Sequence, residues 1–464
     1  MSSSLSVDEL RRLDREVVWH AFSQMSEYDG LIIDHAQGCW LYDVESRRYL
    51  DGVSSLWCNV HGHRHPVIDA AIQKQLGRVA HVTSLGQSHP TTIELADRLV
   101  QLAPKGLEHV FFSSDGSSAV EVALKLAFQY WRQCETPQPE RTTYLAVGNS
   151  YHGDTLGSVA VGGVQRFHAM FHPLLFPVMR GPCPDLYRLP SHVTLENATS
   201  HYLDAYRRIL EEHHHRLVAV IVEPLVQGAA GMVVHPQGFL RGLRDLCSQY
   251  DLFLIADEIA VGMGRTGTLF ACEQEDVAPD LLCLGKGLSG GYLPMAATLA
   301  STRIWKAFLG EYAESKSFFH GHTYGGNPLG AAASLATLQI FDQEQTLRQV
   351  GDKAQFLAEC LKPLKDHPFV GDIRQKGLVA AVELVENKPH KTPYPWSEKR
   401  GILACKAAME KEVWLRPLGN VIPLIPPLSI TLDEIRLMVD ALAFGIDCAT
   451  RSDLQPKVGL RSSL

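Results

Sequence analysis

The residues best suited to chemistry follow two apolar segments that are predicted to be buried strands. The segment 252–256 leads directly into the carboxylates Asp257 and Glu258. The segment 281–284 leads into Lys286, which has a glycine on each side. Because the carboxyl ends of neighbouring parallel strands open into one ligand crevice, we expect these groups to meet there. The sequence therefore predicts a site that contains both an acid and an amine.

An amine and an acid in one buried site match the needs of an aldehyde cofactor. A lysine that loses solvation has more of the neutral amine that forms a Schiff base. Pyridoxal 5′-phosphate acts as an electron sink while its ring nitrogen is protonated, and a buried carboxylate favours that form. We therefore predict that Lys286 holds pyridoxal phosphate and later transfers protons, while Asp257 pairs with the ring nitrogen.

A phosphate group needs its own binding site, and a turn of small residues offers one. Residues 113–118 connect a predicted strand to a predicted helix, where backbone N–H groups bind anions. Taken alone, this segment is better explained by Ser114 or Asp115 as a helix N-cap. Tyr151 directly follows another predicted strand and either stacks on a planar ring or is a buried structural tyrosine. Asp154 would then position the loop around it.

The order of elements predicts an α/β fold. Between about residues 109 and 301 short apolar strands alternate with helices, which is typical of a mostly parallel sheet covered on both faces. The first 65 residues form too few strands to be stable alone, so we expect them to join the C-terminal part. The predicted parts are 1–65 and 331–464 for a smaller α+β domain, and 66–330 for a large cofactor-binding domain. The sheet strands are expected at 110–112, 143–147, 217–222, 252–256, 280–284 and 296–300.

Composition argues against several classes of function. The 464 residues include 43 basic and 51 acidic ones, and the formal net charge of −8 disfavours nucleic acid and anionic membrane as partners. No signal peptide or apolar span is found, so we expect a cytoplasmic protein with small-molecule substrates. The ten cysteines form no C-x-x-C pair. His61, His63 and His65 fit a turn before a helix, and we predict no metal.

Together these segments resemble the class III aminotransferases. The resemblance rests on Asp257-Glu258-Ile259, on Gly264-Arg265-Thr266-Gly267 and on Gly285-Lys286-Gly287, a combination far more specific than any single glycine motif. It covers nearly the whole chain and implies a fold type I homodimer whose active sites lie at the subunit interface. Members of the class that act in biotin biosynthesis are favoured by residues 59–66, 151–155, 226–228 and 270–273.

The resemblance also implies a role for each site residue. Lys286, Asp257 and Tyr151 would carry catalysis. Thr323 would reach the phosphate of the neighbouring subunit's cofactor, and Arg416, a planar bidentate donor, would bind a distal carboxylate of the substrate. The residues implied to bind the cofactor are Gly116, Ser117, Tyr151, Asp257, Lys286, His322 and Thr323. Those implied to bind substrate are Phe22, Leu56, Trp57, Tyr151, Lys286, Gly321 and Arg416.

The implied reaction moves an amino group onto the ketone of 8-amino-7-oxononanoate to give 7,8-diaminononanoate. The donor is S-adenosylmethionine or lysine. Well-known members of the class carry paired tryptophans at Leu56-Trp57, a tyrosine at Phe22 and a proline at His322, and relatives with such substitutions are linked to lysine.

Two other functions stay open at this point. One is a different class III ω-aminotransferase that acts on a diamine or an ω-amino acid. The other is a non-catalytic cofactor-binding sensor, which is disfavoured because no basic DNA-binding segment precedes the cofactor domain.

Overall fold

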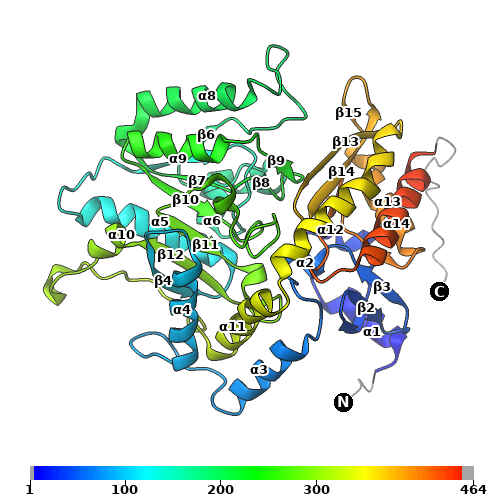
Figure 1. Cartoon of the computed structure of the whole chain (residues 1–464), viewed down its shortest axis with the longest axis horizontal. Helices are drawn as coiled ribbons and strands as arrows, with labels where there is room; N and C mark the ends of the chain where they lie inside the picture. Colours follow the sequence, from blue (N-terminus) through cyan, green and yellow to red (C-terminus); the bar gives the residue numbers. More distant parts are fainter. Residues whose placement is uncertain (1–4, 452–464) are drawn as a thin grey trace.

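The computed structural model describes residues 5–451 and has two lobes (Figure 1). The larger lobe is built on a seven-stranded sheet. Its strands are β4 (Leu107–Ser113), β5 (Thr143–Val147), β6 (Val178–Gly181), β7 (Leu217–Val222), β10 (Phe253–Asp257), β11 (Leu281–Leu284) and β12 (Ala296–Ser301). Their order is β4-β12-β11-β10-β7-β5-β6. Only β12 runs antiparallel to its neighbours in this sheet, β4 and β11.

Helices cover both faces of this sheet (Figure 1). The helices of the larger lobe include α3 (Pro66–Leu76), which packs on α11, and α4 (Pro90–Leu102), α5 (Gly116–Gln133), α6 (Leu156–Val161), α7 (Gln165–His168), α8 (Ala198–His213), α9 (Phe239–Gln249), α10 (Thr302–Lys306) and α11 (Pro328–Gln343). In β10, Phe253 and Ile255 pack into the apolar cluster that contains α5, whereas Leu254 and Ala256 pack into the cluster that contains α9. A strand buried on both faces therefore ends at Asp257, as its continuous apolar sequence predicts.

The smaller lobe combines both parts of the chain that flank the large one. Its strands are β1 (Ile33–Gln37), β2 (Trp40–Asp43), β3 (Arg48–Asp51), β13 (Val370–Lys376), β14 (Val379–Asn387), β15 (Thr392–Pro393), β16 (Val413–Trp414) and β17 (Val421–Leu424). Its helices include α1 (Val7–Val17), α2 (Ser54–Trp57), α12 (Thr346–Leu361), α13 (Arg400–Met409) and α14 (Leu432–Thr450). The N-terminal strand β3 pairs in parallel with the C-terminal strand β16. The predicted α/β fold, with a smaller α+β part from both chain ends, is confirmed, and the domain boundaries at 65 and 330 stay predictions.

Arg265 fastens the two lobes together. Its guanidinium is 1% exposed and donates to the carbonyl oxygens of Asn59 and Pro426, which come from the two ends of the chain. Because burial removes water from the charge, the pKa of Arg265 falls to about 10. The glycine-rich loop after β10 is therefore held against the smaller lobe by a buried cation.

None of the helices within residues 5–451 is long and apolar enough to cross a membrane.

Candidate active site

Asp257 and Lys286 lie at the carboxyl ends of neighbouring parallel strands. Asp257 is the last residue of β10 and pairs in register with Cys283 of β11, and Lys286 follows three residues later. Burial lowers the pKa of Lys286, and the nearby carboxylates of Asp257 and Glu223 offset part of this effect. Lys286 also has a positive φ of 40°, a conformation that side chains rarely adopt and that clusters at functional sites. The structure thus brings the predicted acid and amine together.

Asp257 has a buried partner that the sequence did not reveal. His152 Nδ1 lies 2.7 Å from Asp257 Oδ2, and Asp257 Oδ1 accepts a hydrogen bond from the backbone of Ile259 at 3.0 Å. Because a carboxylate only accepts hydrogen bonds, Nδ1 of His152 carries the proton in this contact. Both side chains are almost fully buried. His152 therefore fixes the orientation of the Asp257 carboxylate.

Two further buried carboxylates bind backbone rather than cations. Glu258 accepts hydrogen bonds from the backbone N–H groups of Ala271 at 2.6 Å and Cys272 at 2.8 Å. Glu223 accepts from the backbone of Tyr151 at 2.9 Å and of Gly228 at 2.8 Å. Burial raises the pKa of each carboxyl to about 7. Glu258 therefore anchors a loop, while Glu223 holds Tyr151 in place beside Asp257.

The N-terminus of α5 forms the predicted anion site. Asp115 is its N-cap and accepts a hydrogen bond from the backbone of Ser118 at 2.9 Å. Within residues 5–451 the backbone N–H groups of Gly116 and Ser117 have no hydrogen-bond acceptor. A Cβ at Gly116 would lie 2.8 Å from the side chain of Ile259. Glycine at position 116 therefore allows Ile259 to pack against the start of α5, and the two unpaired amides at this helix N-terminus suit a phosphate.

Gly153 holds Ser117 against the Tyr151 loop. It has a φ of +124°, and a Cβ there would overlap the Ser117 side chain. We expect Gly153→Ala to weaken cofactor binding by about tenfold, since both strain and displacement of Ser117 oppose the bound arrangement. Titration of cofactor-free protein with pyridoxal phosphate measures this change. Gly351→Ala is the control, because Gly351 lies in α12 with open space around it. Equal affinity in wild type and Gly153→Ala would contradict the expectation.

Two aromatic side chains lie near the amine and the acid. Tyr151 donates a hydrogen bond from its hydroxyl to Asp154 Oδ2 at 2.7 Å. Trp57 is 9% exposed, and its ring centroid lies 5.2 Å from Lys286 Nζ. A Cβ at Gly228 would lie 3.1 Å from the Trp57 ring. Glu223 accepts hydrogen bonds from the backbone of both Tyr151 and Gly228, so one carboxylate positions Tyr151 and the residue that packs against Trp57.

The other predicted residues lie apart from these groups within one chain. Phe22 is 58% exposed and Leu56 is 45% exposed. Gly321 and Thr323 are exposed as well, and His322 Nε2 lies 3.0 Å from His320 Nε2. The structure does not join these five residues to Lys286 or Asp257. Their predicted roles stay predictions.

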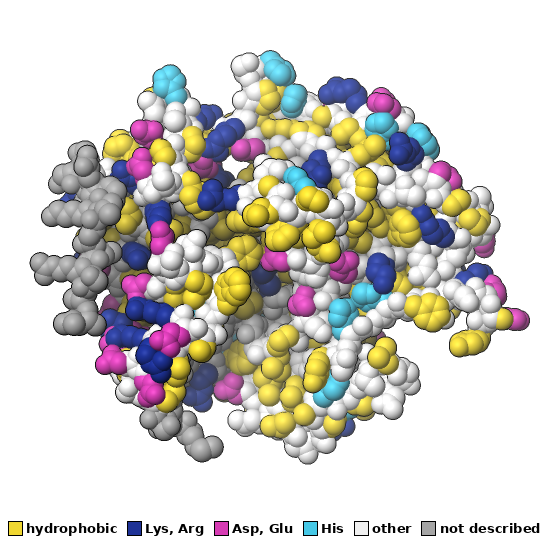
Figure 2. Space-filling view, turned by 180° about the vertical axis from the view of Figure 1, so that it is seen from behind, with side chains coloured by type: hydrophobic (Ala, Val, Ile, Leu, Met, Phe, Trp, Pro, Cys, Tyr) yellow, Lys and Arg dark blue, Asp and Glu magenta, His cyan; other side chains and the backbone are white. Residues whose placement is uncertain are grey.

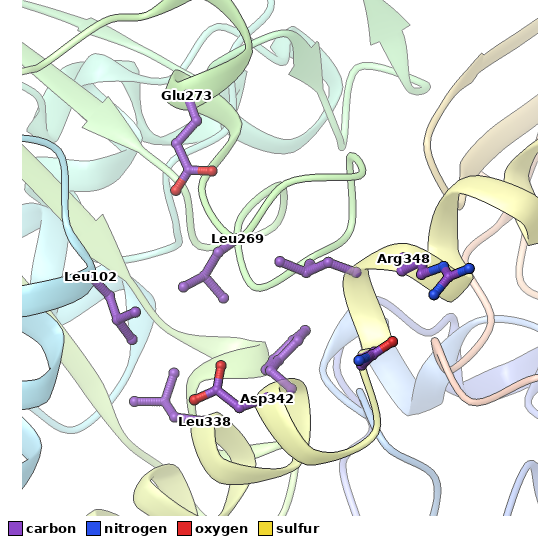
Figure 3. A pocket seen from close by; sticks show the side chains of 9 residues that line it. Leu102, Leu269, Glu273, Leu338, Asp342 and Arg348 are labelled. Atoms are coloured by element: carbon purple, nitrogen blue, oxygen red, sulfur yellow. The ribbon is translucent and has the colours of Figure 1, made fainter.

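A separate hollow of about 300 Å³ lies between the end of α4, the end of α11 and the start of α12 (Figure 3). It is lined mainly by leucines, with Glu273, Asp342 and Arg348 among its polar residues. No predicted site residue lines it, so its position does not bear on the site described above.

The fold and the Lys286–Asp257 pair define a pyridoxal phosphate enzyme of the aminotransferase kind. The chain belongs to the class III aminotransferases, since the family described as Aminotransferase class-III matches residues 23–444. It is therefore a pyridoxal 5′-phosphate-dependent aminotransferase of fold type I.

Its relatives are closely similar over almost the whole chain. It is 52% identical to the adenosylmethionine-8-amino-7-oxononanoate aminotransferase of Nitratidesulfovibrio vulgaris over 444 residues, 95% of this chain and 82% of the relative. The crystal structure of the enzyme of that name from Methanocaldococcus jannaschii matches with a TM-score of 0.90 and 41% identity, covering 95% of this chain and 99% of that one. An omega transaminase from Pseudomonas jessenii in complex with PMP matches with a TM-score of 0.90 and 28% identity, covering 95% and 98%.

Proposed function

We propose that this aminotransferase transfers an amino group to 8-amino-7-oxononanoate and forms 7,8-diaminononanoate in biotin biosynthesis. Relatives that carry this substrate in their names are up to 52% identical to the chain. The observation that carries the proposal is a half-buried arginine, Arg416, which is free to bind a substrate carboxylate.

Arg416 has no carboxylate or hydrogen-bond partner within residues 5–451. Burial lowers its pKa, which means that the charge has lost water without gaining a counter-ion. The neighbouring residue Trp414 accepts a hydrogen bond from the backbone of Gly52 at 3.0 Å. The chain then continues from Gly52 to Trp57. The segment that carries Arg416 therefore packs beside the segment that carries Trp57. The unpaired guanidinium of Arg416 suits a carboxylate at the far end of a substrate held near Trp57.

The cofactor supplies an electron sink for the carbon that gains or loses the amino group. In the proposed mechanism Lys286 Nζ would move a proton between the substrate carbon that bears the amino group and a carbon of the cofactor. The lowered pKa of Lys286 favours the neutral amine that can accept this proton. Asp257 would hold a proton on the cofactor's ring nitrogen, and Tyr151 would lie beside the ring. Gly116 and Ser117 would bind the phosphate.

The proposed active unit is a homodimer in the cytoplasm. Gly321, His322 and Thr323 would complete the neighbouring subunit's site, and Thr323 would contact its cofactor phosphate. Large apolar side chains are exposed in the single chain, such as Met170 at 91% and, two residues before Gly321, Phe319 at 78%. Figure 2 shows hydrophobic side chains gathered in patches around a hollow on one face. A second copy of the chain would cover such surface.

Replacing Arg416 by alanine tests the substrate assignment. We expect the KM for 8-amino-7-oxononanoate to rise by about 100-fold, because a bidentate charge-assisted contact contributes roughly 3 kcal/mol. The half-reaction with the amino donor should change by less than about threefold. Steady-state kinetics for both substrates measure this, with Arg416→Lys as the variant that keeps the charge. An unchanged KM for the acceptor would contradict the proposal.

The donor is S-adenosylmethionine or lysine, and a single-turnover assay separates them. Each amine is mixed with the pyridoxal form, and the formation of the pyridoxamine form is followed by absorption. Phe22, Leu56 and His322 are proposed to shape the donor site. Well-known members carry a tyrosine, a tryptophan and a proline at these three positions. The different residues in this chain favour lysine as the amino donor. Conversion by S-adenosylmethionine alone would exclude lysine.

The alternative is a different ω-aminotransferase activity. The similarity to the structure of an omega transaminase supports this alternative. The pyridoxamine form is incubated with a panel of ketones and aldehydes. Discharge by other acceptors but not by 8-amino-7-oxononanoate would establish the alternative.

A further inference from the structure

The short helix α7 lies beside Tyr151 and carries an aromatic pair. The ring of Phe167 meets Tyr151 edge-on with centroids 6.5 Å apart, and it meets Phe22 edge-on at 5.3 Å. The His168 ring is buried and lies nearly parallel to Tyr151 at 6.0 Å. Phe167 itself is only half-buried, so part of an apolar ring next to Tyr151 remains open.

The other side of α7 reaches the smaller lobe. The Arg166 guanidinium stacks on Trp396, 3.2 Å from the ring centroid, which is a close cation–π contact. The Trp396 ring in turn fills the space beside Gly419, where any Cβ would overlap it. Gly419 lies three residues after Arg416 in the same loop. The helix α7 therefore touches the surroundings of both Tyr151 and the Arg416 loop.

We propose that Phe167 is a specificity-determining residue whose exposed ring packs against the hydrocarbon chain of the acceptor. This inference rests on the proposed function, in which the ketone reacts near Tyr151 and Lys286 while the carboxylate binds Arg416. The methylene groups between these ends must cross the space that α7 borders. Each methylene that is buried on an apolar wall raises affinity about fourfold, so the wall favours long acceptors over short ones. The Arg166–Trp396 contact holds the wall in place.

The test compares acceptors of different length in Phe167→Ala and Phe167→Leu. In the wild-type holoenzyme we expect kcat/KM for ω-carboxylated methyl ketones to rise with each added methylene. In Phe167→Ala this rise should flatten, and the KM for 8-amino-7-oxononanoate should increase by about tenfold. Phe167→Leu should recover most of the loss. The donor half-reaction should fall by less than the acceptor half-reaction, because Phe167 reaches the proposed donor site only through its edge-on contact with Phe22.

Phe171→Ala is the matched control, since Phe171 lies in the following turn, is 47% exposed and has no ring contact among the described residues. Arg166→Gln should shift the length dependence in the same direction as Phe167→Ala, but by less. An unchanged length dependence in Phe167→Ala would overturn the proposal. An equal loss in both half-reactions would also overturn it, because Phe167 would then only support Tyr151. Failure of the wild type to use 8-amino-7-oxononanoate would instead reject the proposed function, while the ketone series would still test the wall.

Discussion

Replacing Lys286 with alanine is expected to abolish covalent attachment of pyridoxal phosphate and to lower kcat by a factor on the order of 10⁴. The amine both holds the cofactor and moves the proton, so one substitution removes two functions. Among the lysines of residues 5–451, Lys286 is the one that follows β11 next to Asp257, so none of the others is placed to take over. The cofactor should still bind non-covalently, since the anion site at α5 and Asp257 remain.

Borohydride reduction followed by peptide mapping measures the attachment. Wild type should carry a reduced pyridoxyl group on Lys286, and the variant should carry none. Lys306→Ala serves as the control, because Lys306 is exposed on α10. The lowered pKa of Lys286 adds a pH test. A lower pKa leaves more neutral amine, so covalent capture of the cofactor by cofactor-free protein should persist to lower pH than with a free lysine peptide. Turnover by Lys286→Ala close to that of wild type would refute the assignment.

The central sheet was predictable because its strands are short, continuous apolar runs. The segments 143–147 and 217–222 coincide with β5 and β7. The strand β10 is shifted by one residue relative to the predicted 252–256, and β11 begins one residue later than the predicted 280–284. The strand β6 was missed. It lies at the edge of the sheet and is only partly buried, so its sequence lacks the apolar run that identifies a central strand.

The site residues were predictable from sequence only where a local pattern, such as an apolar strand that ends in a polar residue, marks them. Asp257, Lys286 and the turn at Gly116 each follow a recognisable strand. The contact between His152 and Asp257 joins residues 105 positions apart in sequence, and no local pattern announces it. The hydrogen-bond partners of Glu223 are backbone N–H groups. Backbone groups occur at every residue, so the sequence gives no sign of which ones are used.

The aromatic wall at α7 shows the same limit. Phe22, Phe167 and Trp396 come from three distant segments, and only the fold brings them into one chain of contacts. Their side chains are partly exposed, so hydrophobic periodicity does not mark them as a group. The residues proposed to act across the subunit boundary, such as Thr323, depend on a second chain, and their assignment rests on family resemblance.

Replacing Asp257 by asparagine is expected to lower kcat by a factor on the order of 10³. The amide keeps the size of the side chain but removes the charge that holds a proton on the ring nitrogen, so the cofactor becomes a weaker electron sink.

Because Lys286 is untouched, Asp257→Asn should still attach the cofactor covalently, which separates its defect from that of Lys286→Ala.

Two variants separate the effect of the Asp257 charge from the effect of its position. Asp257→Glu keeps the charge and should lose less activity than Asp257→Asn. His152→Leu keeps Asp257 but removes the proton donor at Nδ1, which lies 2.7 Å from the carboxylate, and should fall between wild type and Asp257→Asn. Single-turnover absorption changes and the protonation state of the cofactor ring, followed by nitrogen NMR, measure the effect. A ring nitrogen that stays protonated in Asp257→Asn, together with normal turnover, would show that this carboxylate does not set the electronic state of the cofactor.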